Sequence, residues 1–455
     1  MKKILLLLTV SLVATGVAAQ NPTTYFMEGS TFRMQFNPAF APHRGYFNIP
    51  VLGGIDLSVG GNLALGDLFF PRNGKLVTLL DASVSSADAL AGLRTKNGLN
   101  VDSRINILGF GAYTRYRKHF WSFELNMRTA EDTDLPYSLF EFLKTGRSGR
   151  ISNIGVSASA YLEAAFSYSF PLLCERLYIG VRGKFLAGAA RARLTYDRFD
   201  VSLEEDRWNI DARGTIDFTA GGADVSAEEP YFKIGDLDMK PTKPAGYGFA
   251  VDLGATYDIL PDLQASLAVT DLGFMSWSKK NTVSGVSAKS LEFTGTTIPD
   301  DGTPQPDFDL DVLEFERVGA GSSAQMLRTA INAGLEYKLW RRKIGIGLLY
   351  SARFRTGRTL HDLTGSVNFQ PIDWFTVTGS YSVLAGRGGA FGIGLNLCPS
   401  WINFFVATDL LTARRTPQWV PIRQSSVHVT FGLGVPIGRH GQRATKRYIY
   451  PPAML

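Results

Sequence analysis

Residues 154–170 read IGVSASAYLEAAFSYSF, and apolar residues recur at every second position. One face carries the even-numbered residues, and the other carries glycine, serine, tyrosine and Glu163. A period of two over this length predicts a β-strand with one face in apolar surroundings and one in polar surroundings. Strands of soluble domains usually have about 5–6 residues, whereas a strand that crosses a bilayer at a tilt needs about 9–11. The stretch is therefore typical of a membrane-spanning strand.

The same alternation recurs in residues 121–127, 247–257, 344–351 and 427–435. Very short links alternate with longer polar links between such strands, which is the pattern of a transmembrane barrel. The sequence predicts an all-β fold, a transmembrane antiparallel β-barrel of about 14 strands with long extracellular loops and both termini on the periplasmic side. The predicted spans are 46–61, 104–116, 118–128, 152–170, 176–188, 245–258, 261–271, 326–338, 343–355, 360–370, 374–384, 389–397, 401–410 and 426–435.

Residues 208–218 also alternate but do not fit this count. Up-and-down topology allows either zero or two further spans between residues 189 and 244. We expect residues 190–219 to form a hairpin that projects above the membrane, and a barrel of 16 strands is the alternative. Two loop helices are also expected. One has Asp134 as its N-cap and Pro136 in its first turn and stops at Gly146, and the other is capped by Ser85–Ser86 and runs through Leu90 and Leu93.

The composition excludes several classes of protein. Apolar residues make up 45% of the 455 residues, which is too many for a disordered chain. The long apolar run is confined to residues 4–19, so a multi-pass helical membrane protein is excluded. The net charge of +6 comes largely from the two ends of the chain, which leaves the body nearly neutral and unsuited to nucleic acid.

The ends of the chain suggest export from the cytoplasm. Residues 1–19 have the basic start, apolar stretch and small-residue cleavage site of a secretory signal peptide. We therefore expect a barrel over residues 46–438 and a basic periplasmic tail over residues 439–455. The expected location is the outer membrane of a Gram-negative bacterium, after cleavage of the signal peptide.

Two short motifs link the chain to a known group. Asn37-Pro38-Ala39 precedes the first strand, and Asp271-Leu272-Gly273-Phe274 with Trp277 ends a later one. With these motifs the chain resembles the FadL-type long-chain fatty-acid transporters and PorV-like barrels, and within them the uncharacterised outer-membrane barrels of Bacteroidetes. The resemblance implies 14 strands and a lumenal plug formed by about residues 20–45. Some relatives are subunits of a protein-secretion system. The chain departs from the pattern because a basic tail follows its last strand.

Charged residues occur on the polar faces of the predicted strands. At the bilayer midplane, an Arg or Lys that faced lipid would cost roughly 2–4 kcal/mol, so these side chains are expected to face the lumen. They form either an ionic network that holds the plug, which we favour, or the lining of a conduction path. The residues are Glu124, Glu163, Arg182, Lys184, Asp252, Arg328, Glu336 and Arg353.

The sequence shows no catalytic, cofactor or metal motif. The five histidines form no metal-spaced pair, and no G-x-S-x-G elbow occurs, so we do not expect an enzyme. The acidic loop 300–316 is expected to be solvated, and a weak divalent-cation site is the alternative. Cys174 and Cys398 are expected to be free thiols, with a bridge between them as the alternative.

The expected function is passive transport of hydrophobic or amphipathic small molecules. The alternative is a non-transporting barrel that serves as a scaffold or subunit of an envelope or secretion complex. Expected partners are outer-membrane lipid, lipopolysaccharide, a hydrophobic small-molecule ligand and an envelope protein.

Overall fold

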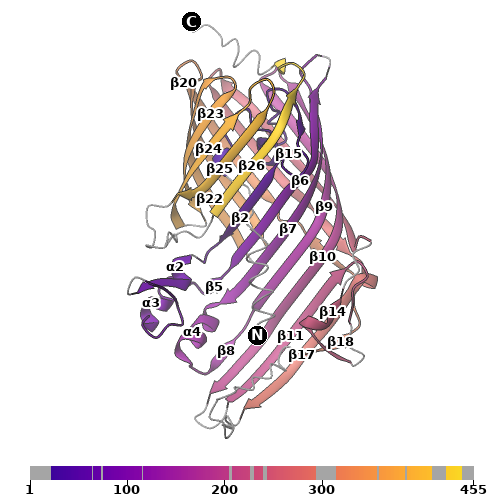
Figure 1. Cartoon of the computed structure of the whole chain (residues 1–455), viewed down its shortest axis with the longest axis vertical. Coiled ribbons are helices and arrows are strands. Elements are labelled where there is room, and N and C mark those ends of the chain that lie inside the picture. Colours follow the sequence, from indigo (N-terminus) through magenta and orange to yellow (C-terminus); the bar gives the residue numbers. More distant parts are fainter. Residues whose placement is uncertain are drawn as a thin grey trace.

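The long alternating strands close into an antiparallel barrel in the computed structural model of the chain (Figure 1). The wall has 14 strand positions, and it closes where the last strand pairs with the first. The structure describes residues 22–63, 65–72, 75–114, 116–203, 208–225, 230–238, 243–293, 314–355, 358–384, 387–411 and 427–442. The signal peptide, most of the acidic loop and the end of the basic tail lie outside these residues.

The predicted membrane spans match the wall strands. The wall consists of β1 (Gly45–Asn48) with β2 (Ile55–Gly61), β6 (Leu99–Tyr113), β7 (Phe120–Pro136), β9 (Ile154–Leu172), β10 (Leu177–Leu203), β15 (Gly246–Leu260), β16 (Leu263–Trp277), β19 (Ser323–Met326) with β20 (Ala330–Leu339), β21 (Ile344–Arg355), β22 (Arg358–Ile372), β23 (Phe375–Leu384), β24 (Arg387–Leu397), β25 (Asn403–Leu411) and β26 (Val427–Ile437). The prediction of 14 strands is confirmed.

The first span is broken, which corrects the prediction of a continuous strand over 46–61. Both β1 and β2 pair with β6 and β26, so they occupy one position in the wall. Between them, Val51 has a φ of 68° and follows Pro50, which has no N–H to donate to a ladder. The interruption follows from these two residues.

At one end the sheet of the barrel continues past the wall as a projecting sheet. β10 continues past the wall and pairs from Ala190 to Leu203 with β11 (Trp208–Ala220), as expected for the projecting hairpin. β11 pairs in turn with β17 (Thr282–Phe293). This strand was not predicted, because residues 272–325 were expected to be a link between the spans 261–271 and 326–338. β17 was missed because its partner is this projecting sheet, where bilayer thickness gives no guide to strand length. Near these strands lie β12 (Asp224–Val225), β13 (Tyr231–Lys233), η3 (Ile234–Asp236), β14 (Leu237–Asp238), η4 (Lys279–Asn281) and β18 (Glu314–Val318).

The loops at the same end include two predicted helices. α3 (Ser86–Leu90) has the predicted cap, because the Ser85 side chain accepts a hydrogen bond from the Asp88 backbone N–H. α4 (Tyr137–Thr145) is followed by Gly146, whose φ of 64° suits glycine. The prediction of an Asp134 cap is wrong, because Asp134 lies in β7 and the N-cap is Pro136, without a side-chain cap. Figure 1 shows these helices together at one side of the barrel end. The other elements there are α2 (Leu65–Leu68), β3 (Phe69–Arg72), β4 (Lys75–Thr78), β5 (Lys96–Asn97) and β8 (Gly149–Ile151).

The two faces of the wall have opposite chemistry. On β15, Tyr247, Phe249, Val251 and Leu253 are exposed on the outside, whereas Asp252 between them is buried. Leu349 broke the alternation in the sequence, and the structure places it inward against buried aromatic residues of the N-terminal segment. Among the described residues, no helix is long and apolar enough to cross a membrane.

The chain enters the barrel before its first strand. The segment contains η1 (Pro22–Thr24) and η2 (Thr31–Gln35), and every residue from Pro22 to Phe40 is buried. Its aromatic residues pack edge to face, with the ring of Tyr25 at 4.8 Å from Phe26 and 5.1 Å from Phe40. The lumen beside the short turns is therefore filled by the protein's own chain.

Both cysteines lie in short turns and are free. Cys174 is exposed, whereas Cys398 is partly buried, and this burial raises the pKa of the Cys398 thiol to about 11.

Candidate functional site

The Asn37-Pro38-Ala39 motif is fitted against the inner wall. The Asn37 side-chain amide donates to the carbonyl oxygens of Ala255 at 3.2 Å and Leu267 at 3.3 Å. The Asn37 side-chain oxygen accepts from the Ala39 backbone N–H at 2.9 Å, which closes a tight local turn. The Asn37 side chain thus joins β15 and β16, and the local turn holds it in place.

Paired glycines make the recess that holds this motif. Gly180 of β10 lies opposite Gly254 of β15 in the ladder. A Cβ at Gly180 would lie 2.1 Å from the carbonyl carbon of Pro38, and one at Gly254 would lie 2.0 Å from Asn37 Oδ1. No side chain fits at either position while the N-terminal segment stays in place.

Charged and polar groups also fix the segment. Gln35 Nε2 donates to Glu124 Oε2 at 2.6 Å, and the Glu28 carboxylate pairs with Lys338 Nζ at 3.2 Å. Lys338 also contacts Glu336 at 3.2 Å. These contacts link the segment to β7 and β20, on different parts of the wall.

An ionic network lies next to the segment, on the side away from the short turns. Arg182 is fully buried, and it contacts Glu124 at 2.5 Å, Glu163 at 3.5 Å and Asp252 at 3.9 Å. Lys184, two residues further along β10, contacts Asp252 at 2.7 Å. The structure therefore brings together five of the eight inward charges expected from the sequence.

Two members of this network were not predicted. Arg128 forms a bidentate pair with Asp271, at 2.8 and 3.0 Å, and also contacts Glu163 at 2.8 Å. Arg128 is in phase with Glu124, so the period of two could have identified it. Asp271 is out of phase, and it turns inward through a bulge with a φ of 57°, which alternation cannot predict.

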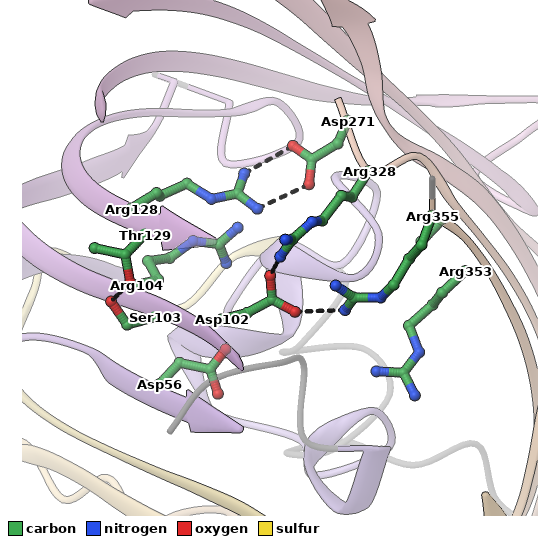
Figure 2. Close-up of a pocket in the computed structure, with 11 residues that line it drawn as sticks. Asp56, Asp102, Ser103, Arg104, Arg128, Thr129, Asp271, Arg328, Arg353 and Arg355 are labelled. Carbon is green, nitrogen blue, oxygen red and sulfur yellow. Dashed lines mark hydrogen bonds and ion pairs between the residues drawn. The ribbon is translucent and has the colours of Figure 1, made fainter. Parts of the chain in front are cut away.

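A charged cavity of about 60 Å³ lies beyond the network (Figure 2). Arg328 contacts Asp102 and lies 2.6 Å from Asp132, and Arg355 also contacts Asp102. Arg353 pairs with Asp362 at 2.5 Å. The residues that line the charged cavity are Asp56, Asp102, Ser103, Arg104, Arg128, Thr129, Asp271, Arg328, Ala330, Arg353 and Arg355. Arg328 and Arg353 of the predicted set thus belong here, whereas Glu336 is beside the N-terminal segment.

A smaller cavity of about 30 Å³ adjoins the charged one, and its lining mixes charged and apolar side chains. The two share Asp102, Arg128 and Arg328. The rest of its lining is Ala130, Ser159, Tyr161, Met275, Trp277, Gln325, Met326 and Leu327. Apolar side chains such as Met275, Trp277 and Leu327 thus lie beside the charged cavity.

The wall beside the smaller cavity is irregular. β16 pairs with β20 up to Thr270 and with β19 from Phe274 onward. Between these ladders, Leu327 N donates to Gly273 O at 2.9 Å and the Thr329 hydroxyl donates to Asp271 O at 3.1 Å. We call this interruption the seam. Because the bulge at Asp271 also shifts the register with β15, β16 is irregular on both sides here.

The described part of the barrel interior has no candidate metal site. Among the residues that the structure describes, no group of three or more His, Cys, Asp or Glu side chains could hold a metal ion. His428 faces the lumen, 3.5 Å from Asp409.

Comparison with protein families agrees with the extent of the barrel. The model of the "Family of unknown function (DUF5723)" matches residues 38–409. The chain belongs to the DUF5723 family. The match begins within the Asn37-Pro38-Ala39 motif and covers all but the last wall strand. No curated protein sequence matches this DUF5723 chain.

Solved structures with a similar fold are distant in sequence. The DUF5723 chain is similar to the toluene transporter TbuX of Ralstonia pickettii, with 10% identity, 92% of this chain and 97% of that chain covered, and a TM-score of 0.41. It is also similar to the toluene transporter TodX of Pseudomonas putida, with 8% identity, coverage of 92% and 94%, and a TM-score of 0.37. A third similar structure is the CymD monoaromatic hydrocarbon channel, with 8% identity, coverage of 94% and 99%, and a TM-score of 0.35.

Proposed function

We propose that this protein is an outer-membrane barrel that carries hydrophobic or amphipathic small molecules. The observation that supports this function is that the charged cavity adjoins, next to the seam, a smaller cavity that also exposes the apolar side chains of Met275, Trp277 and Leu327. An amphipathic molecule would place its polar group among the arginines and its apolar part near Met275, Trp277 and Leu327. Transport would be passive and would involve no covalent step.

The N-terminal segment would direct the route. It fills the lumen beside the short turns, so a ligand in the two cavities has no straight path to that rim. The seam is the nearest weakness in the wall, because two hydrogen bonds replace a regular ladder there. We infer that ligands leave sideways through the seam, with the segment as a plug and the ionic network as its support.

The packed lumen also favours a second candidate. Buried contacts at Asn37, Gln35 and Glu28 hold the segment on several strands, as expected for a barrel that does not transport. In that case the protein would be a scaffold or subunit of an envelope complex. Lipid and lipopolysaccharide would contact the outer wall in either case.

A reversible lock across the seam tests the transport route. Phe274 and Met326 are ladder partners next to the interruption, and both point outward. Because Leu327 N donates to Gly273 O, the 274–326 pair is a non-hydrogen-bonded pair, whose Cα atoms lie only about 4.5 Å apart. We expect oxidised F274C/M326C, in a C174S/C398S background, to lose uptake of an amphipathic fluorophore into proteoliposomes and to regain it on reduction.

The matched control is a lock in the regular part of the wall. Ile346 and Val367 are outward-facing partners in the β21–β22 ladder, and they also form a non-hydrogen-bonded pair. Oxidised I346C/V367C should transport like the unlocked protein. Equal uptake by both locked variants would contradict the seam route. Failure of the unlocked protein to take up any probe would contradict transport and favour the scaffold.

A further inference from the structure

Arg104 is a buried arginine with unused hydrogen-bond donors. Its side chain lines the charged cavity and the residue is 6% exposed. Its Nε and Nη1 atoms are buried and have no hydrogen-bond partner. Figure 2 shows no interaction from Arg104 to the other lining residues. Burying guanidinium donors without acceptors is costly. A ligand that supplied acceptors to Arg104 in this cavity would remove that cost.

Two other arginines of the cavity have spare donors. Arg353 pairs with Asp362 through Nη2 alone, which leaves its buried Nε and Nη1 without partners. Arg355 uses both terminal nitrogens on Asp102 and Asp132, but its buried Nε has no partner. Together with Arg104, five buried N–H-bearing atoms of the lining lack acceptors. Charge-assisted hydrogen bonds from several guanidinium groups are typical of oxyanion recognition.

Asp56 has a buried hydrogen-bond acceptor without a donor. It lies directly across from Arg104 in the β2–β6 ladder, lines the same cavity and is 3% exposed. Its Oδ1 atom is buried and has no donor. The carboxylates of Asp102 and Asp271 are already paired with arginines. A ligand that accepts hydrogen bonds from these arginines and donates one to Asp56 would satisfy both sets of atoms.

We propose that this cavity binds an oxyanion that retains a proton, the chemistry shared by inorganic hydrogen phosphate and a protonated phosphate monoester. Such a group has several acceptor oxygens for Arg104, Arg353 and Arg355 and one P–O–H donor for Asp56. A space of about 60 Å³ exceeds what one water needs, about 10–15 Å³. Sulfate has no proton near neutral pH, so it would leave Asp56 without a donor and add charge repulsion.

The inference deepens the proposed function, because a phosphate head would make the carried molecule amphipathic. Its test is nevertheless separate, because binding to detergent-solubilised protein involves no transport. Loss of transport with binding intact would contradict only the proposed function, and loss of binding would contradict only this inference.

Calorimetric titration of the full-length protein at about pH 6, where phosphate monoesters are partly protonated, tests the site. The ligands are inorganic phosphate, sulfate and hexyl phosphate. We expect both phosphates to bind more tightly than sulfate. Loss of the Arg104 charge-assisted bonds in Arg104→Gln should weaken phosphate binding by about tenfold to a hundredfold. Asp56→Asn should remove the preference for phosphate over sulfate.

Arg198→Gln is the matched control, because Arg198 lies outside the cavity and its side chain is half exposed. It should bind phosphate like the natural protein. Tighter binding of hexyl phosphate would assign the site to the head of an amphiphile, and tighter binding of inorganic phosphate would assign it to the free ion. Equal binding of sulfate and phosphate, or no binding of either, would overturn the proposal and leave a water-filled cavity.

Discussion

Gly180→Val should open the barrel to ions. A Cβ at position 180 would lie 2.1 Å from the Pro38 carbonyl carbon and 2.2 Å from the Ala39 nitrogen, so the overlap is with backbone and no rotamer relieves it. Either the wall or the N-terminal segment must move. β10 is held by ladders to β9 and β15, whereas Asn37 is held by a few hydrogen bonds, each worth about 0.5–1.5 kcal/mol. We expect the segment to be displaced.

Conductance of planar lipid bilayers measures this opening. The natural protein should conduct weakly, and Gly180→Val should produce larger current steps. Gly183→Val is the control, because Gly183 lies three residues along the same strand and a Cβ there meets nothing within 4 Å. If folded Gly180→Val conducted no more than Gly183→Val, the N-terminal segment would not be what closes the lumen.

Arg182→Met should cause the largest loss of stability among single substitutions in the network. Arg182 is fully buried and contacts Glu124, Glu163 and Asp252. Its removal leaves the buried Glu124 carboxylate without the cation that it contacts, which costs about 3–5 kcal/mol in comparable sites. The midpoint of denaturant unfolding in lipid vesicles should fall accordingly.

Replacing an exposed arginine, Arg198, gives a loss of stability with which the Arg182 loss can be compared. Arg198 pairs with Asp200 and Asp211 outside the membrane, and Arg198→Met should cost about 0–1 kcal/mol. The double variant Arg182→Met/Glu124→Gln should recover part of the loss, because one uncompensated charge is removed with the cation. Similar losses in Arg182→Met and Arg198→Met would show that the buried network contributes little to stability.

The sequence predicted the wall well because a bilayer imposes one length and one period on every strand. That constraint ends outside the membrane, which is why β17 was assigned to a loop. It also ends where the backbone is irregular. Val51 breaks the first strand, and the bulge at Asp271 turns inward a residue that alternation places outside.

The interior was predicted in part. Alternation identified Arg182 and Lys184 as inward, and their common network follows because they lie two residues apart on β10. Arg104 was not among the predicted inward charges, although it lies at the start of a predicted span and is in phase with the inward positions there. Neither cavity could be predicted, because each depends on contacts between strands that are distant in sequence.

Spin-label accessibility along β15 tests the placement of the barrel most directly. Single cysteines at positions 247–257, in the C174S/C398S background, would be labelled with a nitroxide after reconstitution into lipid. Collision with oxygen, which partitions into hydrocarbon, should be high at odd-numbered positions such as Phe249 and Leu253. Labels at even-numbered positions such as Asp252 should be shielded from oxygen. If instead the odd-numbered positions collided mainly with a water-soluble nickel complex, the outer wall would lie in water and the membrane placement would be wrong.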